Sequence, residues 1–310
     1  MADVFFIIDG DKLQAQAHFL AASIIDHKSA VDRYFAYIRP GVDLPASLRG
    51  LLDKANIELR DIPRLSPDPW SAPYPIGNKL LAAADNRGGE VSVFLDTDTI
   101  FCGAVDFEAE LGEAKVGAVL SDYRAGGLSN SAAWVDIYEF LGIDMPSERP
   151  GTLRRPHMDY PPYFNAGMVI LRERSANKDL CLGKEWLKVS LALDNEFDVA
   201  ARGISRANID QIALSALGSR VGAPTKSMPQ KLNYNVMAWG GPPVGTDCAI
   251  AHYHVFGRLW KAGRVGQVAL SSLRKHLGQV AFAGFVNEYR THLYWRRAKR
   301  LVSDQPDIMQ

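Results

Sequence analysis

Two carboxylates two positions apart, Asp96 and Asp98, follow an apolar run in the segment VSVFLDTDTIF. β-Branched and aromatic residues favour a strand, and ligands of open α/β folds bind at the carboxyl edge of the sheet. Side chains at i and i+2 of an extended segment share a face, so both carboxylates can converge on one hard cation. Carboxylate oxygens suit magnesium or manganese. In the alternative interpretation, Asp96 caps a turn and Asp98 is solvated.

The elements that must position these carboxylates alternate between strand and helix along the chain. We expect strands at residues 4–8, 33–38, 57–62, up to 95, 116–120, 164–171 and 249–254. We expect helices at residues 13–25, 44–55, 76–86, 132–141, 180–193, 208–217 and through most of 271–302. This alternation predicts an α/β fold with a mostly parallel sheet and right-handed crossovers.

Length and composition narrow the class of protein. A chain of 310 residues predicts one large domain or two closely packed halves. Lysine plus arginine and aspartate plus glutamate number 35 each, which gives no global electrostatic case for nucleic acid. The cysteines, Cys102, Cys181 and Cys248, form no zinc or disulfide pattern and favour a reducing cytoplasm. The start lacks a signal-peptide pattern, and no apolar run reaches the roughly 20 residues of a membrane span.

Four segments in order, LDTDTIF, PYFNAGMVIL, NIDQIAL and IAHYHVFGRLWK, resemble the family 8 glycosyltransferases. These retaining enzymes move a hexose from a nucleotide diphosphate. The opening FIIDGDKLQAQ is similar to that family's first strand and nucleotide-binding turn. The resemblance covers residues 4–262 and implies a GT-A fold, a Rossmann-like mixed sheet flanked by helices. It divides the chain into a nucleotide-sugar half, 1–124, an acceptor half, 125–262, and a helical tail, 263–310.

The resemblance also implies a divalent metal, manganese or magnesium, held by Asp96, Asp98 and one histidine. His254 satisfies the family's His-x-x-Gly, whereas His252 better fits its histidine–aromatic step. Both histidines have the same strand parity, so both can face the site; we favour His254. The family's final Lys-Pro-Trp is missing, and Leu259-Trp260-Lys261 stands there.

The remaining site residues are carried over from the same motifs. Asp9 and Asp11 would bind uracil or ribose, and the alternative is a simple turn. Lys79 would be the basic residue before the metal strand, or a solvated helical lysine. Asp210 would bind donor-sugar hydroxyls, or cap the helix begun at Asn208. Other residues that would border the donor are Asp122, Asn165, Ala166, Gln211 near the anomeric carbon, and Gly257 and Lys261 near the diphosphate.

These residues predict a metal-dependent retaining transfer of a hexose from a UDP-sugar to a saccharide or lipid-linked acceptor. One alternative is a haloacid-dehalogenase-like phosphatase with Asp96 as nucleophile and Asp98 as acid and base. That fold places its aspartate pair on the first strand, and we find no later acidic pair for its magnesium. A second alternative is a sugar-nucleotide-binding protein without activity, because Lys-Pro-Trp is missing.

The tail, residues 282–302, reads FAGFVNEYRTHLYWRRAKRLV. Tryptophan and tyrosine beside clustered cations are typical of a helix at an anionic membrane interface. This pattern predicts peripheral contact with the inner face of the cytoplasmic membrane. The alternative is an ordinary surface helix that packs its apolar stripe on the domain.

Overall fold

The computed structural model describes residues 2–128, 131–173, 181–243 and 247–294. The chain forms two compact units, each assembled from separate segments. Unit 1 comprises residues 1–3, 62–94 and 107–229, and unit 2 comprises residues 4–61, 95–106 and 230–310. Each unit takes segments from both sides of residue 124, and the division into a nucleotide-sugar half and an acceptor half stays a prediction.

Unit 2 begins with β1 (Ala2–Ile8), whose seven residues are all buried. This continuous apolar run behaves as expected for a strand covered on both faces. The helix α1 (Asp11–Asp26) is preceded by Gly10 at its N-cap, whose φ of 83° suits a residue without Cβ. The strand order is β3-β2-β1, and β2 pairs in parallel with β3. The further elements here are β2 (Val31–Ile38), α2 (Ala46–Lys54) and β3 (Ile57–Asp61).

A second, three-stranded sheet of unit 2 joins segments far apart in sequence. Its order is β5-β10-β9, with β10 antiparallel to β5 and parallel to β9. The bounds are β5 (Thr99–Phe101), β9 (Tyr234–Asn235) and β10 (Ile250–His252). The helices of this part of the chain are α8 (Val236–Trp239), α9 (Phe256–Leu259), α10 (Arg264–Leu277), α11 (Gln279–Glu288) and α12 (Arg290–Leu293).

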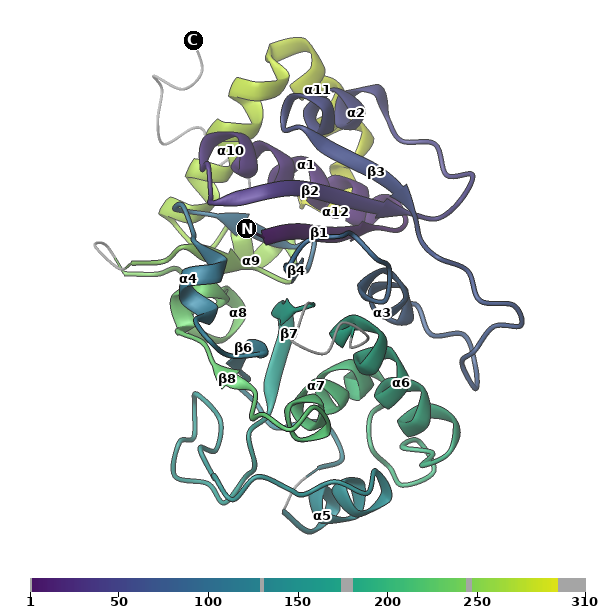
Figure 1. The fold of residues 1–310 in the computed structure, drawn as a ribbon. Coiled ribbons are helices and arrows are strands. Elements are labelled where there is room, and N and C mark those ends of the chain that lie inside the picture. Colours follow the sequence, from purple (N-terminus) through teal and green to yellow (C-terminus); the bar gives the residue numbers. More distant parts are fainter. Residues whose placement is uncertain (1, 129–130, 174–180, 244–246, 295–310) are drawn as a thin grey trace. The chain divides into compact units, whose positions relative to one another are not determined.

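Unit 1 contributes strands in the order β4-β7-β6-β8. Strands β6 and β7 are antiparallel, with an irregularity between Ala118 and Val119, and β8 pairs in parallel with β6. Helices α6 and α7 pack on each other, and α7 packs on β7 (Figure 1). The strands are β4 (Val91–Leu95), β6 (Val116–Leu120), β7 (Phe164–Arg172) and β8 (Lys226–Ser227). The helices are α3 (Gly77–Ala83), α4 (Phe107–Leu111), α5 (Ser131–Phe140), α6 (Leu182–Asn195) and α7 (Ile209–Arg220). The predicted α/β class with a mixed, helix-flanked sheet is confirmed.

The C-terminal helices are part of the core of unit 2. Helix α10 contacts α1, and Phe285, Val286, Tyr289 and Leu293 are buried. The Tyr289 hydroxyl donates to Gln14 Oε1 at 3.0 Å. These apolar side chains therefore pack as in an ordinary surface helix. The cations from Arg296 to Arg300 lie outside the described residues, so membrane contact through 282–302 stays a prediction.

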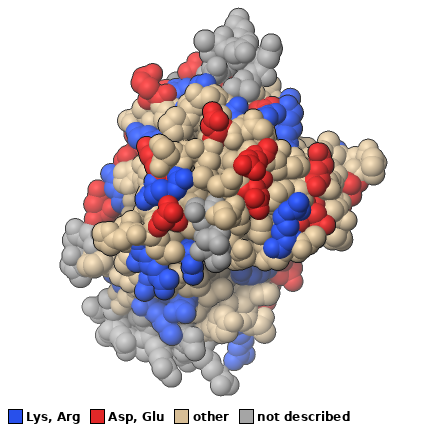
Figure 2. Space-filling model, turned by 90° about the horizontal axis from the view of Figure 1, so that it is seen from below, with Lys and Arg blue, Asp and Glu red and all other residues tan. Residues whose placement is uncertain are grey.

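Two properties of the described surface and helices bear on partners. Figure 2 shows lysine and arginine interspersed with aspartate and glutamate on the face that it presents. Among the described residues, no helix is both long and apolar enough to cross a bilayer.

His18 of α1 packs against the C-terminal helices, and its burial makes the free energy of unfolding depend on pH. Its Nδ1 donates to Gln14 O at 2.8 Å, and its ring lies 4.6 Å from that of Phe285. Burial lowers the pKa of His18 from 6.5 to about 4, against a smaller opposing effect of the Gln14 carbonyl. The unfolded chain therefore binds the proton more readily. The contribution of neutral, buried His18 to the free energy of unfolding is therefore complete above about pH 6.5 and is lost as the pH falls toward 4.

We expect the free energy of unfolding to fall by about 2 kcal/mol between pH 7 and pH 5 through His18 alone. His18→Gln should remove this part of the pH dependence in urea titrations at the two pH values. The exposed His157 is the control, and His157→Gln should keep the wild-type dependence. If the free energy of unfolding of His18→Gln falls between pH 7 and pH 5 as much as that of the wild type, His18 is not the group responsible.

Candidate functional site

The Asp96-Thr97-Asp98 segment forms a tight turn after β4. The Thr99 N–H and hydroxyl both donate to Asp96 O, at 3.1 and 2.8 Å. The buried Thr97 hydroxyl donates to Ile7 O of β1. The two carboxylates therefore leave a hydrogen-bonded turn, and the predicted extended i, i+2 geometry is wrong. The turn is favoured because Thr97 and Thr99 satisfy backbone carbonyls that a strand would pair with a neighbouring strand.

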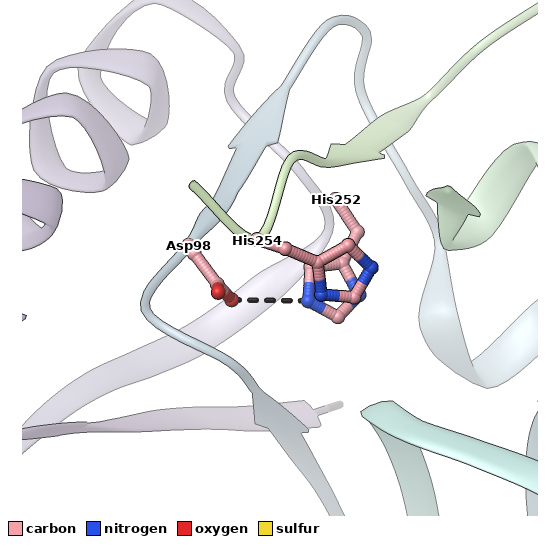
Figure 3. A group of neighbouring side chains, drawn as sticks. All are labelled: Asp98, His252 and His254. Atoms are coloured by element: carbon pink, nitrogen blue, oxygen red, sulfur yellow. Dashed lines mark ion pairs between the residues drawn. The ribbon is translucent and has the colours of Figure 1, made fainter. Parts of the chain in front are cut away.

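Asp98, His252 and His254 form a compact cluster within unit 2 (Figure 3). His252 Nε2 lies 3.0 Å from Asp98 Oδ1 and 3.8 Å from Asp96 Oδ2. One ligand atom from each of the three clustered residues lies within 4.8 Å of the others. Two atoms bound to one ion at about 2.1 Å lie at most about 4.2 Å apart. The cluster fits a divalent ion after small side-chain adjustments, with Asp96 at its edge.

Burial and neighbouring charges shift the pKa of Asp98 and of His254. Burial opposes charge on Asp98, but the His252 imidazole outweighs it and holds the pKa of Asp98 well below its usual range. Burial, followed by the neighbouring His252, lowers the pKa of His254 from 6.5 to about 3. A carboxylate and a neutral imidazole are the forms that bind metal. Lys12 acts electrostatically on both Asp98 and His254.

The structure brings both alternative histidines to the site, for a reason other than strand parity. Strand β10 ends at His252, and His254 has a left-handed φ of 59°. Such a conformation costs a non-glycine residue about 1–3 kcal/mol, and residues of this kind cluster at active sites and ligand clamps. Residues i and i+2 of a continued strand would lie about 6.6 Å apart. The turn instead brings the two ring centres to 3.9 Å.

Sequence reasoning missed three residues beside this cluster: Lys12, Asn233 and Asn235. His252 Nδ1 lies 3.0 Å from Asn233 Oδ1, and His254 Nε2 lies 3.1 Å from Asn235 Oδ1. The chain repeats one pattern, Asn-Tyr-Asn at 233–235 and His-Tyr-His at 252–254. That matched spacing was the available signal.

The predicted nucleotide and diphosphate residues of unit 2 differ in their surroundings. Asp9 pairs with Arg39, with Nε and Oδ1 2.5 Å apart. Asp11 is exposed in the first turn of α1. Gly257 is buried in α9, and Lys261 is exposed just after that helix. The Asp9 carboxylate therefore has a structural partner, and Asp11 and Lys261 are accessible to solutes.

In unit 1, the structure brings three predicted residues together. Lys79 Nζ lies 2.6 Å from Asp210 Oδ2 and 3.5 Å from Ala166 O. It also lies 5.0 Å from the centre of the Phe94 ring. The Lys79 side chain is only 11% exposed and that of Asp210 3%. Lys79 is therefore a buried ion-pair partner, and the alternative of a solvated helical lysine is wrong.

Only one of the two carboxylate oxygens of Asp210 has a partner among the described residues. Asp210 lies in the first turn of α7, while Asn208 occupies the cap position. The Trp186 indole donates to Asp210 O at 2.8 Å. Among the described residues, the buried Asp210 Oδ1 has no hydrogen-bond partner. A buried carboxylate oxygen without a donor is costly, and this oxygen can accept a ligand hydroxyl.

The other predicted residues of unit 1 lie at the ends of strands and helices. Asn165 Oδ1 accepts from the Gly167 N–H at 2.8 Å, where the β6–β7 register shifts. Asp122 is buried just after β6, and Gln211 is half-buried in the first turn of α7. Asn165 therefore shapes the strand end, while Gln211 keeps part of its side chain accessible.

Comparisons with solved structures identify the fold. The galactosyltransferase LgtC, solved with donor and acceptor sugar analogs, has a TM-score of 0.53 at 14% identity, covering 91% of this chain and 99% of that chain. Mouse xyloside xylosyltransferase 1 has a TM-score of 0.50 at 12% identity, covering 82% and 98%. GlyE of Streptococcus pneumoniae TIGR4 has a TM-score of 0.50 at 15% identity, covering 93% and 63%. The predicted GT-A fold is confirmed, and the family 8 resemblance agrees with the likeness to LgtC.

Among curated proteins, none matches this chain. A family model described as the Rhodobacterales glycosyltransferase domain matches residues 4–222. This match covers Asp96 and Asp98 and favours the glycosyltransferase interpretation of these residues over the phosphatase alternative. Because the matched residues make up more than half of the sequence, the chain belongs to the Rhodobacterales glycosyltransferases.

Proposed function

We propose that this glycosyltransferase is metal-dependent and retaining, and that it moves a hexose from a UDP-sugar to a saccharide or lipid-linked acceptor. The observation that carries the proposal is the convergence of Asp98, His252 and His254 in a chain of this family. LgtC, which shares the fold, was solved with donor and acceptor sugar analogs. Manganese or magnesium is the proposed ion.

The chemistry explains why unit 2 needs this cluster. Breaking a sugar–diphosphate bond leaves negative charge on the diphosphate, and a bound divalent ion supplies Lewis-acid stabilisation of that charge. Asp98, His252 and His254 would hold the ion, with Asp96 beside them. Lys12 and Lys261 add positive charge from flexible, exposed side chains. Asp11 offers acceptors for the N–H and hydroxyl groups of uridine.

In unit 1, we assign Asp210 to the donor sugar. Lys79 Nζ lies 2.6 Å from one carboxylate oxygen of Asp210 and fixes its position. The other oxygen is left to accept a hydroxyl, and a hydrogen bond to a charged group contributes about 1.5–3 kcal/mol. Gln211, one residue later, offers an amide. Because an amide is a poor nucleophile, we propose retention without a covalent enzyme intermediate, with the acceptor attacking on the leaving-group side.

Changing either carboxylate at the proposed metal centre should abolish most of the turnover. We expect Asp98→Asn and Asp96→Asn each to lower manganese-dependent UDP release by at least about a hundredfold, through loss of several kcal/mol of Lewis-acid stabilisation. The assay uses a panel of UDP-sugars with a saccharide acceptor. In a separate test of retention, NMR of the wild-type product should show the α-anomer from an α-linked donor. Asp53→Asn, on the exposed face of α2, is the control and should keep full activity. Near-native rates in both site variants, or a β-linked product, would refute the proposed mechanism.

Changing Asp210 should separate sugar binding from metal binding. Asp210→Asn keeps the volume but loses the charged acceptor, so kcat/KM for the donor should fall about 10- to 150-fold. The affinity for manganese, measured by calorimetry, should stay unchanged, because all proposed ligands belong to unit 2. The exposed Asp144 of unit 1 provides the control variant Asp144→Asn. Weaker manganese binding in Asp210→Asn would contradict this division of roles.

A further inference from the structure

Two asparagines contact the two histidines of the metal cluster from a neighbouring strand. Strand β9 runs parallel to β10, with Asn235 opposite His252. Asn233 Oδ1 lies 3.0 Å from His252 Nδ1, and Asn235 Oδ1 lies 3.1 Å from His254 Nε2. The two contacts use different ring nitrogens. His252 Nε2 and His254 Nδ1 are therefore the nitrogens that do not contact the asparagines.

The orientation of the Asn235 amide is fixed by a second hydrogen bond. Its Oδ1 also accepts from the Ala238 N–H at 3.0 Å, at the start of α8. Only the amide oxygen can accept from a backbone N–H. The atom that faces His254 is therefore an oxygen, so His254 Nε2 must carry the proton. In the neutral ring, His254 Nδ1 then holds the lone pair.

His252 has the opposite arrangement. Its Nδ1 donates to Asn233 Oδ1, and its Nε2 lies 3.0 Å from Asp98 Oδ1. The His252 side chain is only 3% exposed, which holds the ring in this orientation. The left-handed backbone of His254 brings the second ring to 3.9 Å from the first. Both rings lie beside Asp98 (Figure 3). From the asparagine contacts we infer that His252 offers Nε2 and His254 offers Nδ1.

We propose that Asn233 and Asn235 are positioning residues that set the two imidazole tautomers, so that His252 Nε2 and His254 Nδ1 both bind the ion held by Asp98. This inference rests on the metal centre assigned under the proposed function. Two imidazoles suit first-row transition metals, whereas magnesium prefers oxygen ligands and water. The site therefore selects manganese or a later divalent transition metal over magnesium. Partners behind metal-binding histidines typically change metal affinity 10- to 100-fold.

A matched pair of variants at Asn235 tests the positioning role. Asn235→Ser keeps a good helix-capping hydroxyl but is too short to reach His254, whereas Asn235→Asp keeps acceptors for both partners. We expect Asn235→Ser to weaken manganese binding to the otherwise metal-free protein about 10- to 100-fold, and Asn235→Asp to stay near wild type. Calorimetry with MnCl₂ and MgCl₂ gives the affinities, and wild type should bind manganese at least about tenfold more tightly than magnesium.

The tautomers can also be read without any substitution. In the zinc-loaded wild-type protein, long-range ¹⁵N–¹H NMR should show His252 protonated at Nδ1 and His254 protonated at Nε2. Equal manganese affinity in Asn235→Ser and wild type, equal affinity for magnesium and manganese, or the reverse tautomers would each overturn the inference. Asp98→Asn separates the two levels. If it keeps manganese binding, the metal centre itself is wrong; if it loses binding while Asn235→Ser does not, only the positioning role is wrong.

Discussion

The hydrogen-bonding of β10 to two neighbouring strands is the constraint on which the metal cluster depends. On one side, β10 pairs antiparallel with β5, which starts one residue after Asp98. On the other side, it pairs with β9, which ends at Asn235. The Tyr253 N–H extends this pairing to Asp98 O at 3.0 Å. Carboxylate, imidazoles and amides from three distant segments are thereby held within contact of one another.

Each unit holds one cluster of the predicted site residues. Unit 2 holds the Asp98 carboxylate against the buried His252 and the half-buried His254, and unit 1 holds the Lys79–Asp210 pair with one carboxylate oxygen unpartnered among the described residues. Buried charges are costly unless paired, and each of these carboxylates has a basic side chain beside it. Under the proposed function, the cluster in unit 2 compensates the charge of a diphosphate and the pair in unit 1 accepts sugar hydroxyls.

Local pattern predicted much of this from sequence, and long-range pairing supplied the rest. The apolar run of β1 and the run before Asp96 gave their strands correctly, because buried strands have a strong local signal. The two-residue strand β9 is too short for such a signal, and only the matched Asn-Tyr-Asn and His-Tyr-His spacing pointed to Asn233 and Asn235. The left-handed turn at His254 is likewise invisible to strand parity, which assumed a continued strand. The interleaving of the two units reflects contacts between segments more than a hundred residues apart.

The central claim is that Asp98, His252 and His254 hold one divalent ion in unit 2. Anomalous diffraction at the manganese absorption edge, from crystals grown with MnCl₂, tests this most directly. We predict one strong anomalous peak in direct contact with an Asp98 carboxylate oxygen, His252 Nε2 and His254 Nδ1. A protein-bound manganese ion away from these three side chains, with none among them, would contradict the account.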